Sequence, residues 1–287
     1  MSTVPLTESA SSSVVRYDFA AMPRYLVNLS GIVLSVPYPA SKARDGSLDL
    51  CGVYDIYQEW NYEMWGRLPY IDLLKFDLAY HLSGALKKAN AVAELRVLAK
   101  LVWAQDSDGL DLRDIEQLAE WVLTSVQKAF REKDKQIVAE RLEELGLGGR
   151  DSHKDSVKAF GKLIKAVYGN ELEGKNIVED LRLWRRPRQP EELFTCLING
   201  VPWLIYEAFR PHDHGHVVAH AAVTPSHVVT LTFYLDDKTP DYFSPNLNVD
   251  DVIPLDIRNL MREIRVIYSP YARTDAHIAD RRADEVV

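Results

Sequence analysis

The pair Asn199-Gly200 is the sequence feature that most constrains the fold, because it separates two strand-like runs. These runs, 193–198 and 201–209, are rich in large apolar and β-branched side chains. A two-residue connection between antiparallel strands needs positive φ at both positions, which Asn and Gly tolerate best. A second pair of such runs, 216–223 and 227–235, flanks the sequence Thr-Pro-Ser. The pattern predicts about four antiparallel strands in the C-terminal part of the chain.

A terminal helix is expected after these strands. Pro254 is suited to the first helical position, where its missing N–H group has no intrahelical partner. The helix would run to Arg265, with apolar residues recurring on one face. Between strands and helix, residues 236–252 are predicted to form a polar loop.

The N-terminal part is predicted to combine strand and helix. Residues 25–36 indicate one strand or a bent pair of strands, stopped by prolines. The acidic, aromatic region 53–80 follows, and the spacing of Tyr54, Tyr57 and Trp60 suits one helical face. The composition of 85–104 favours a helix, since Ala, Leu, Lys and Glu are good helix formers. Further amphipathic helices are expected over 111–130 with Asp111 as N-cap, over 137–145 and over 157–167.

The fold class predicted from these patterns is α+β. The basic, proline-containing stretch 181–190 is the expected boundary, because the apolar period changes there from helical to strand-like. We therefore predict an N-terminal strand-plus-helical domain over 14–185 and a small antiparallel sheet with a C-terminal helix over 190–273. Residues 1–13 and 274–287 are predicted to be flexible tails.

Acidic residues are concentrated in two segments of this chain of net charge −8. Residues 45–72 contain six acids and one base, and residues 236–251 contain five acids and one base. Direct nucleic-acid binding is not expected, because it needs a basic surface. Acids beside exposed aromatics would instead attract a basic protein, although a core helix with inward-facing aromatics is the alternative for the first segment. The candidate partner-binding residues are Asp55, Glu59, Trp60, Glu63, Asp236, Asp237 and Asp241.

A cluster of histidines gives the main alternative, a metal-dependent hydrolase. Five of the eight histidines fall within residues 212–227. Imidazoles two positions apart on a strand point to the same face and can share a metal ion. The candidate ligands are His212, His214, His216 and His220. A histidine-rich polar connection between strands explains the same pattern without a metal.

Other features favour a protein without catalysis or cofactor, located in the cytoplasm. The two cysteines, Cys51 and Cys196, have no metal-ligand spacing and fit a reducing compartment. The chain lacks a Gly-x-Ser-x-Gly nucleophile turn and a phosphate-binding loop. The first residues do not resemble a secretory signal, and no apolar run is long enough to span a bilayer.

Several stretches resemble immunity proteins paired with effectors of the bacterial type VI secretion system. They are Ile198-Asn-Gly-Val-Pro-Trp203-Leu-Ile-Tyr206, the later Leu-Thr-Phe-Tyr-Leu, the terminal Leu-Met-x-x-Ile, and Ser-Gly-Ile-Val-Leu-Ser-Val-Pro-Tyr near the N-terminus. The resemblance implies a protein that binds a cognate toxin and blocks its active site or substrate groove. The cytoplasmic expectation points to a nuclease toxin, whose basic groove an acidic partner could occupy. The resemblance implies a nuclease of the restriction-endonuclease-like kind. An acidic secretion chaperone or adaptor is a second alternative.

Overall fold

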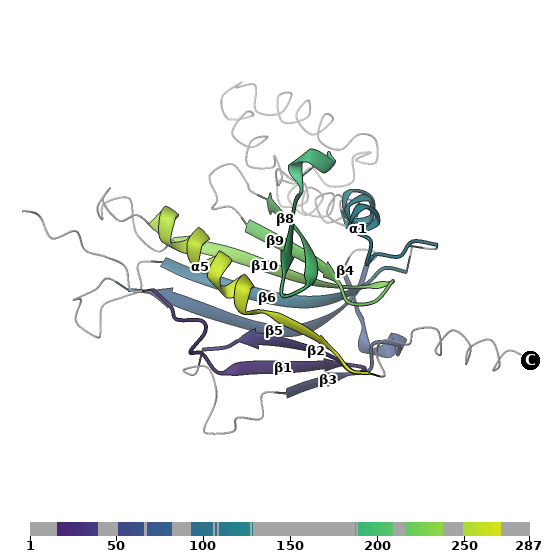
Figure 1. Cartoon of the computed structure of the whole chain (residues 1–287), viewed down its shortest axis with the longest axis horizontal. Helices are drawn as coiled ribbons and strands as arrows, with labels where there is room; N and C mark the ends of the chain where they lie inside the picture. Colours follow the sequence, from purple (N-terminus) through teal and green to yellow (C-terminus); the bar gives the residue numbers. More distant parts are fainter. Residues whose placement is uncertain are drawn as a thin grey trace, which may run out of the picture.

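A seven-stranded sheet is the largest element of the computed structural model (Figure 1). Its strand order is β4-β5-β6-β10-β9-β8-β7, and all neighbours are antiparallel. The strands are β4 (Glu63–Trp65), β5 (Leu68–Tyr80), β6 (Ala93–Trp103), β7 (Phe194–Ile198), β8 (Val201–Ala208), β9 (His216–Ala222) and β10 (His227–Asp237). The structure describes residues 16–39, 51–65, 68–81, 93–105, 107, 109–126, 128, 187, 189–208, 216–237 and 249–270.

A four-stranded sheet and helices complete the described structure. The smaller sheet has the order β11-β2-β1-β3, in which only β1 and β3 are parallel. Its strands are β1 (Arg24–Leu29), β2 (Ile32–Pro37), β3 (Cys51–Tyr54) and β11 (Arg265–Tyr268). The helices are α1 (Ile115–Trp121), which continues as a π-helical turn (Val122–Val126), α5 (Val249–Glu263), and the short 3₁₀ helices η2 (Glu59–Asn61) and η4 (Pro190–Glu192).

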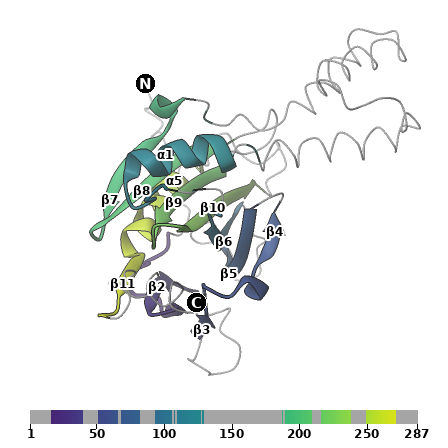
Figure 2. The same ribbon diagram turned by 90° about the vertical axis from the view of Figure 1, so that its right-hand side faces the viewer.

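The two faces of the seven-stranded sheet bury separate hydrophobic clusters. On the inner face, side chains such as Leu101 and Phe233 pack with the smaller sheet and with α5 residues such as Leu260. On the outer face, Leu204 and its neighbours pack against Trp121 and the rest of the α1 region. Figure 2 shows α1 and the smaller sheet on different sides of the larger sheet. No described helix is long and apolar enough to cross a bilayer.

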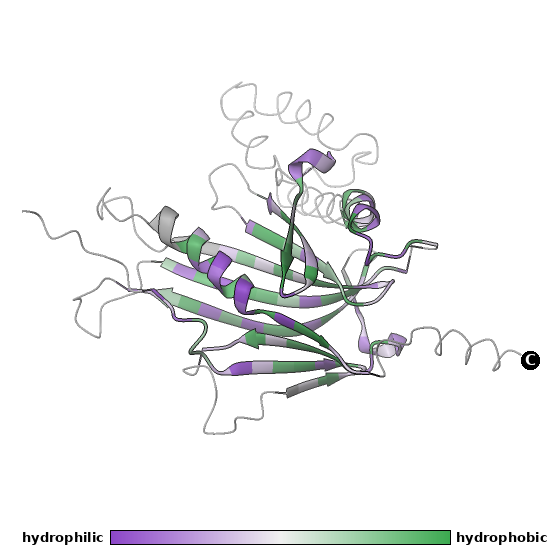
Figure 3. Cartoon of the chain, in the orientation of Figure 1, coloured by the Kyte–Doolittle hydropathy of each residue, from purple (hydrophilic) through white to green (hydrophobic). Residues whose placement is uncertain are grey.

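The predicted α+β class is wrong, because the described residues are mostly strand. The clearest case is 85–104, where a helix was expected and β6 forms from Ala93 to Trp103. Along β6, residues 93, 95, 97, 99 and 101 are fully buried and alternate with more exposed positions. This period of two, visible as alternating hydropathy in Figure 3, prevails over the helix propensity of Ala, Leu and Lys.

The aromatic region is also not a helix. Residues 53–80 form the end of β3, the single turn η2, and the strands β4 and β5. Tyr54 packs against the inner core from a strand, and Trp60 lies in η2 with its side chain in solvent. The three-residue spacing of Tyr54, Tyr57 and Trp60 therefore does not place them on one face.

The predicted hairpins are confirmed. Asn199 and Gly200 have φ values of 50° and 79° and join β7 to β8, with Ile198 opposite Val201. The pair around Thr-Pro-Ser is β9 and β10. In the N-terminal part, residues 25–36 form the hairpin β1–β2, turning at Ser30 and Gly31 with positive φ.

Two predicted element ends are shifted. Pro254 lies inside α5, which begins five residues earlier at Val249. The N-cap of α1 is Asp114, whose Oδ1 accepts from the backbone N–H of Glu116 at 2.9 Å. The expected cap Asp111 instead accepts from Arg113 at 2.7 Å.

The predicted boundary at 181–190 does not divide the larger sheet. β6, from the N-terminal side, pairs with β10, from the C-terminal side, along eleven residue pairs from Ala93↔Asp237 to Trp103↔His227. The four predicted strands thus continue into β6, β5 and β4. The predicted tails 1–13 and 274–287 and the predicted helices over 137–145 and 157–167 lie outside the described residues.

Candidate functional site

Exposed acidic, aromatic and apolar side chains lie along the segment from β3 to β4. Trp60 at its centre is 79% exposed, and Met64 and Val53 are also exposed. Three predicted partner-binding acids, Asp55, Glu59 and Glu63, belong to the same segment, and all are exposed. We refer to Val53, Asp55, Glu59, Trp60, Glu63 and Met64 as the acidic–aromatic surface.

The loop is tied to the turn between β1 and β2. Ser30 Oγ donates to Asp55 Oδ1 at 3.2 Å and accepts from the Ile56 backbone N–H at 3.1 Å. The Ser30 backbone N–H donates to the Tyr54 carbonyl at 3.1 Å. Asp55 Oδ1 also accepts from the Tyr57 backbone N–H at 3.1 Å. Asp55 therefore shapes the loop in addition to contributing charge.

A buried carbonyl anchors the loop to the core. Ile56 is fully buried, and its carbonyl oxygen accepts from Tyr62 Oη at 2.7 Å and from His227 Nε2 at 3.0 Å. Because a carbonyl can only accept, Nε2 of His227 must bear a hydrogen. The other ring nitrogen, Nδ1, lies 2.8 Å from Thr224 Oγ1. Burial lowers the pKa of His227 to about 4, so the neutral ring persists at physiological pH.

Aromatic rings enclose His227 beneath the loop. The ring of Trp103 is stacked on His227 at 5.9 Å between centroids, and Tyr57 meets it edge-on at 5.6 Å. Tyr62 also contacts Trp103, at 5.4 Å. These contacts with the buried His227 and the loop's hydrogen bonds hold the backbone on both sides of Trp60, so its indole is presented from a rigid support.

The carboxylates continue from the loop onto the adjacent strands. Glu63 Oε2 accepts from Tyr70 Oη at 2.8 Å, a bond that, with a smaller contribution from burial, raises the pKa of Tyr70 to about 12. Lys100 Nζ lies 3.3 Å from Asp72 and 3.9 Å from the centroid of the Tyr70 ring. The ammonium group of Lys100 thus contacts both Asp72 and the Tyr70 ring, and the side chain of Asp72 remains 65% exposed.

The described start of the second acidic segment, Asp236 and Asp237, lies away from this surface. Asp236 and Asp237 end β10 opposite Glu94 and Ala93, whereas His227 begins the same strand beneath the loop. Nine residue steps separate Asp236 from His227, which corresponds to about 30 Å along a strand. Asp241, the third acid predicted in that segment, lies outside the described residues.

The described histidines are placed unfavourably for metal binding. His220 is buried, with Nδ1 2.9 Å from Thr230 Oγ1 and Nε2 3.3 Å from Tyr206 Oη, so both ring nitrogens have protein partners. His216 packs edge-on against the ring of Tyr234. Within the described ranges, no three His, Cys, Asp or Glu side chains form a group that could hold a metal ion. His212 and His214 lie outside those ranges.

Sequence reasoning missed the contributions of Val53, Met64, Ser30 and His227. His227 was grouped with the other histidines, but its pairing with Trp103 across β10 and β6 places it under the loop. No sequence spacing indicates that contact. Comparisons of the chain with protein-family models, curated proteins and solved structures give no match.

Proposed function

We propose that the chain is a non-catalytic immunity protein that binds a basic toxin through the acidic–aromatic surface. The observation that carries the proposal is Trp60, which is 79% exposed on a loop held by two hydrogen bonds to the carbonyl of the buried Ile56. An exposed Trp on a rigid support suits a binding hot spot, because little conformational entropy is lost when it is covered. The adjacent exposed carboxylates favour a positively charged partner.

A nuclease active in the cytoplasm is the proposed toxin. Its groove must attract phosphate and is therefore basic. Glu59 and Glu63 flank Trp60 and carry their charge at the protein surface, where they can steer such a groove and occupy it. Inhibition would result from occlusion, so it requires no catalytic residue and no cofactor from this chain.

The first experiment tests protection in cells. The reading frame adjacent to the gene for this chain is induced in a host that lacks both, with and without the chain. We expect growth to stop and DNA to be degraded without the chain, and growth to recover with it. A host that dies despite the chain would contradict the proposal. Complex formation that leaves nuclease activity intact would indicate an adaptor or chaperone instead.

The second experiment assigns the surface. Trp60→Ala should weaken toxin binding at least about 30-fold, as expected of a hot-spot Trp. The pair Glu59→Lys and Glu63→Lys should mainly slow association, and the effect should shrink as salt is added. The matched control is Glu116→Lys with Glu120→Lys, which makes the same charge change at exposed positions of α1. Equal effects of the two double variants would remove the acidic–aromatic surface from the proposal.

A further inference from the structure

The strand β7 forms an edge of the larger sheet among the described strands, and its own residues lack the usual protection against pairing. Its only partner among the described strands is β8. Its sequence, Phe-Thr-Cys-Leu-Ile, contains no charge, proline or glycine. Phe194 is 65% exposed and Leu197 is 73% exposed. Edge strands are normally blocked by charges, prolines or bulges, so an apolar, unblocked edge indicates a pairing site.

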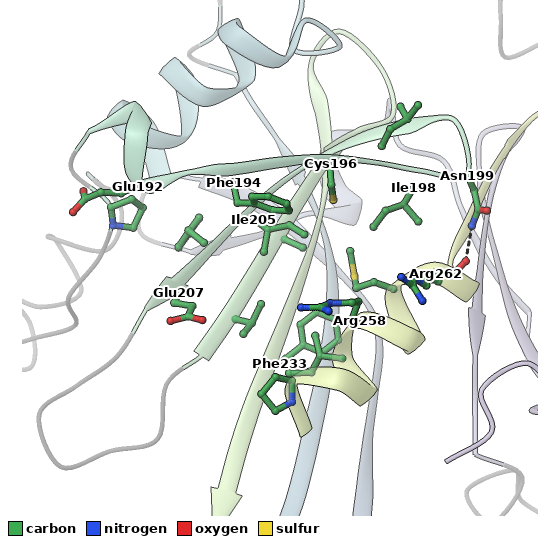
Figure 4. Close-up of a pocket in the computed structure, with 18 residues that line it drawn as sticks. Glu192, Phe194, Cys196, Ile198, Asn199, Ile205, Glu207, Phe233, Arg258 and Arg262 are labelled. Carbon is green, nitrogen blue, oxygen red and sulfur yellow. Dashed lines mark hydrogen bonds between the residues drawn. The ribbon is translucent and has the colours of Figure 1, made fainter. Parts of the chain in front are cut away.

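A groove runs beside this edge, between β7 and α5 (Figure 4). Its volume is about 1260 Å³, more than most small-molecule sites provide. Apolar side chains such as Ile198, Phe233 and Met261 are among those that line it. Glu192 lies at the end where β7 begins. Arg262 lies near the other end, where Asn199 Nδ2 donates to the Arg262 carbonyl at 2.8 Å.

We propose that a second copy of this chain occupies the edge, giving a two-fold dimer in which the two β7 strands pair antiparallel about Cys196. Cys196 is the midpoint of β7, so an axis there lets all five residues pair. Phe194 would face Ile198 of the second copy, and Thr195 would face Leu197 of the second copy. Both exposed apolar side chains would then be covered by cross-strand contacts.

The backbone N–H and C=O groups of β7 point alternately toward β8 and toward the free edge, in the order that this register needs. Leu197 lies opposite Pro202, which has no N–H group, so this pair occupies a non-hydrogen-bonded position toward β8. The N–H and C=O groups of Leu197, and of Thr195 two residues away, therefore point to the free edge. In the proposed register these two residues form the hydrogen-bonded pairs between copies, and Cys196 forms a non-hydrogen-bonded pair with its own counterpart.

The charges at the ends of the groove are complementary under the same two-fold axis. Antiparallel pairing brings the start of one β7 to the end of the other. Glu192 of the second copy is thereby placed at the Asn199 end, near Arg262, and the reciprocal contact forms as well. A surface that is acidic at one end and basic at the other is thus self-complementary.

The dimer leaves the acidic–aromatic surface free. β4 and β7 are the two edges of the seven-stranded sheet and lie on opposite sides of the molecule in Figure 2. The dimer would therefore bind two toxin molecules, and its existence does not depend on the proposed function.

Sedimentation of the full chain tests the proposal. We expect a dimer of twice 32.7 kDa that dissociates on dilution. Leu197→Lys should raise the dissociation constant roughly 100-fold or more, since it places a charge on the pairing edge and removes the apolar side chain that faces Thr195 of the second copy. The matched control Ile267→Lys, an exposed position on the edge strand β11, should leave the dimer intact. Circular dichroism verifies that both variants fold. A monomer at every concentration would overturn the proposal.

Cross-linking tests the register. In a non-hydrogen-bonded antiparallel pair the Cα atoms are about 4.5 Å apart, which a disulfide can span. Copper–phenanthroline at pH 8.5 should therefore link the two copies covalently in Cys51→Ser protein and form no covalent link in Cys196→Ser protein, which should still sediment as a dimer. The alkaline pH compensates for burial, which raises the pKa of the Cys196 thiol. A dimer that withstands Leu197→Lys, or that cannot be linked through Cys196, would refute this interface. Protected Thr195 and Leu197 amides in a monomer would show that another segment of the chain covers the edge.

Discussion

Two buried histidines should make the folded protein lose stability steeply between pH 7.5 and pH 5. His220 and His227 are each 2% exposed. Burial lowers the pKa of His220 to about 3 and that of His227 to about 4, compared with about 6.5 in an unfolded chain. They lie on opposite faces of the larger sheet, His220 beside Tyr206 and His227 beneath the loop that carries Trp60.

The direction of this pH effect on stability follows from the number of protons that the folded and unfolded chains bind. Below pH 6.5 the unfolded chain protonates both imidazoles and the folded chain keeps them neutral, so acid favours unfolding. The stabilisation is fully present above pH 6.5 and is lost as the pH falls toward the folded-state values. At pH 5 each buried histidine lowers the free energy of unfolding by about 2 kcal/mol relative to pH 7.5, since each pH unit below the unfolded-state pKa contributes about 1.4 kcal/mol. Together they cost about 4 kcal/mol, which is large against the 5–15 kcal/mol typical of a folded domain.

Urea unfolding at half-unit steps from pH 7.5 to pH 5 measures this loss. The slope of the unfolding free energy near pH 5.5 should correspond to the uptake of nearly two protons on unfolding. His220→Gln and His227→Gln should each reduce the proton uptake on unfolding, read from the slope, by about one proton. This holds even if the substitution lowers the stability at pH 7.5. His81→Gln is the matched control, because His81 is exposed. A wild-type slope below one proton, or an unchanged slope in both buried-site variants, would refute the argument.

Two further predictions concern single side chains, and urea unfolding at pH 7.5 measures both. Ile56→Ala should lower the free energy of unfolding by about 3 kcal/mol, because Ile56 is fully buried, whereas Val53→Ala, at an exposed position of the same segment, should change it by less than about 0.5 kcal/mol. Arg16→Ala should lower the free energy of unfolding by about 3 kcal/mol, since it leaves the fully buried Asp256, 3.2 Å away, without its cation. Arg113→Ala, which breaks an ion pair at the surface, should lower it by about 0.5 kcal/mol or less. Equal effects of the two substitutions would contradict the assigned role of burial.

Local signals predicted the hairpins correctly and failed for β6. A two-residue turn depends on the φ preferences of Asn199 and Gly200 alone, so the sequence specifies it directly. In β6, Ala, Leu and Lys favour a helix, but the strand lies between β5 and β10 and buries one side chain in two. Burial between two strands contributes more than the few tenths of a kcal/mol per residue that helix propensity offers.

The described residues of the predicted site lie in two separate parts of the structure. Asp55, Glu59, Trp60 and Glu63 stand out in the sequence because acids and aromatics are concentrated there, and the structure leaves each of them exposed in the segment from β3 to β4. Asp236 and Asp237 were singled out for the same reason, but they end β10 far from this loop. Counting charges along the sequence shows where acids are concentrated but gives no distance between segments in the fold. It therefore could not show that Asp236 and Asp237 lie far from the loop that carries Trp60.

The sequence by itself determined the turns, the strand pairs around them and the concentration of acidic residues, because these depend on neighbouring residues. Only the tertiary structure decided that one sheet extends from β4 to β7 and that Trp60 faces solvent over a buried His227. It also decided that β7 remains an open edge among the described strands. These features arise from pairing between residues more than a hundred positions apart, and the free energy of such contacts is set by packing and burial rather than by local preference.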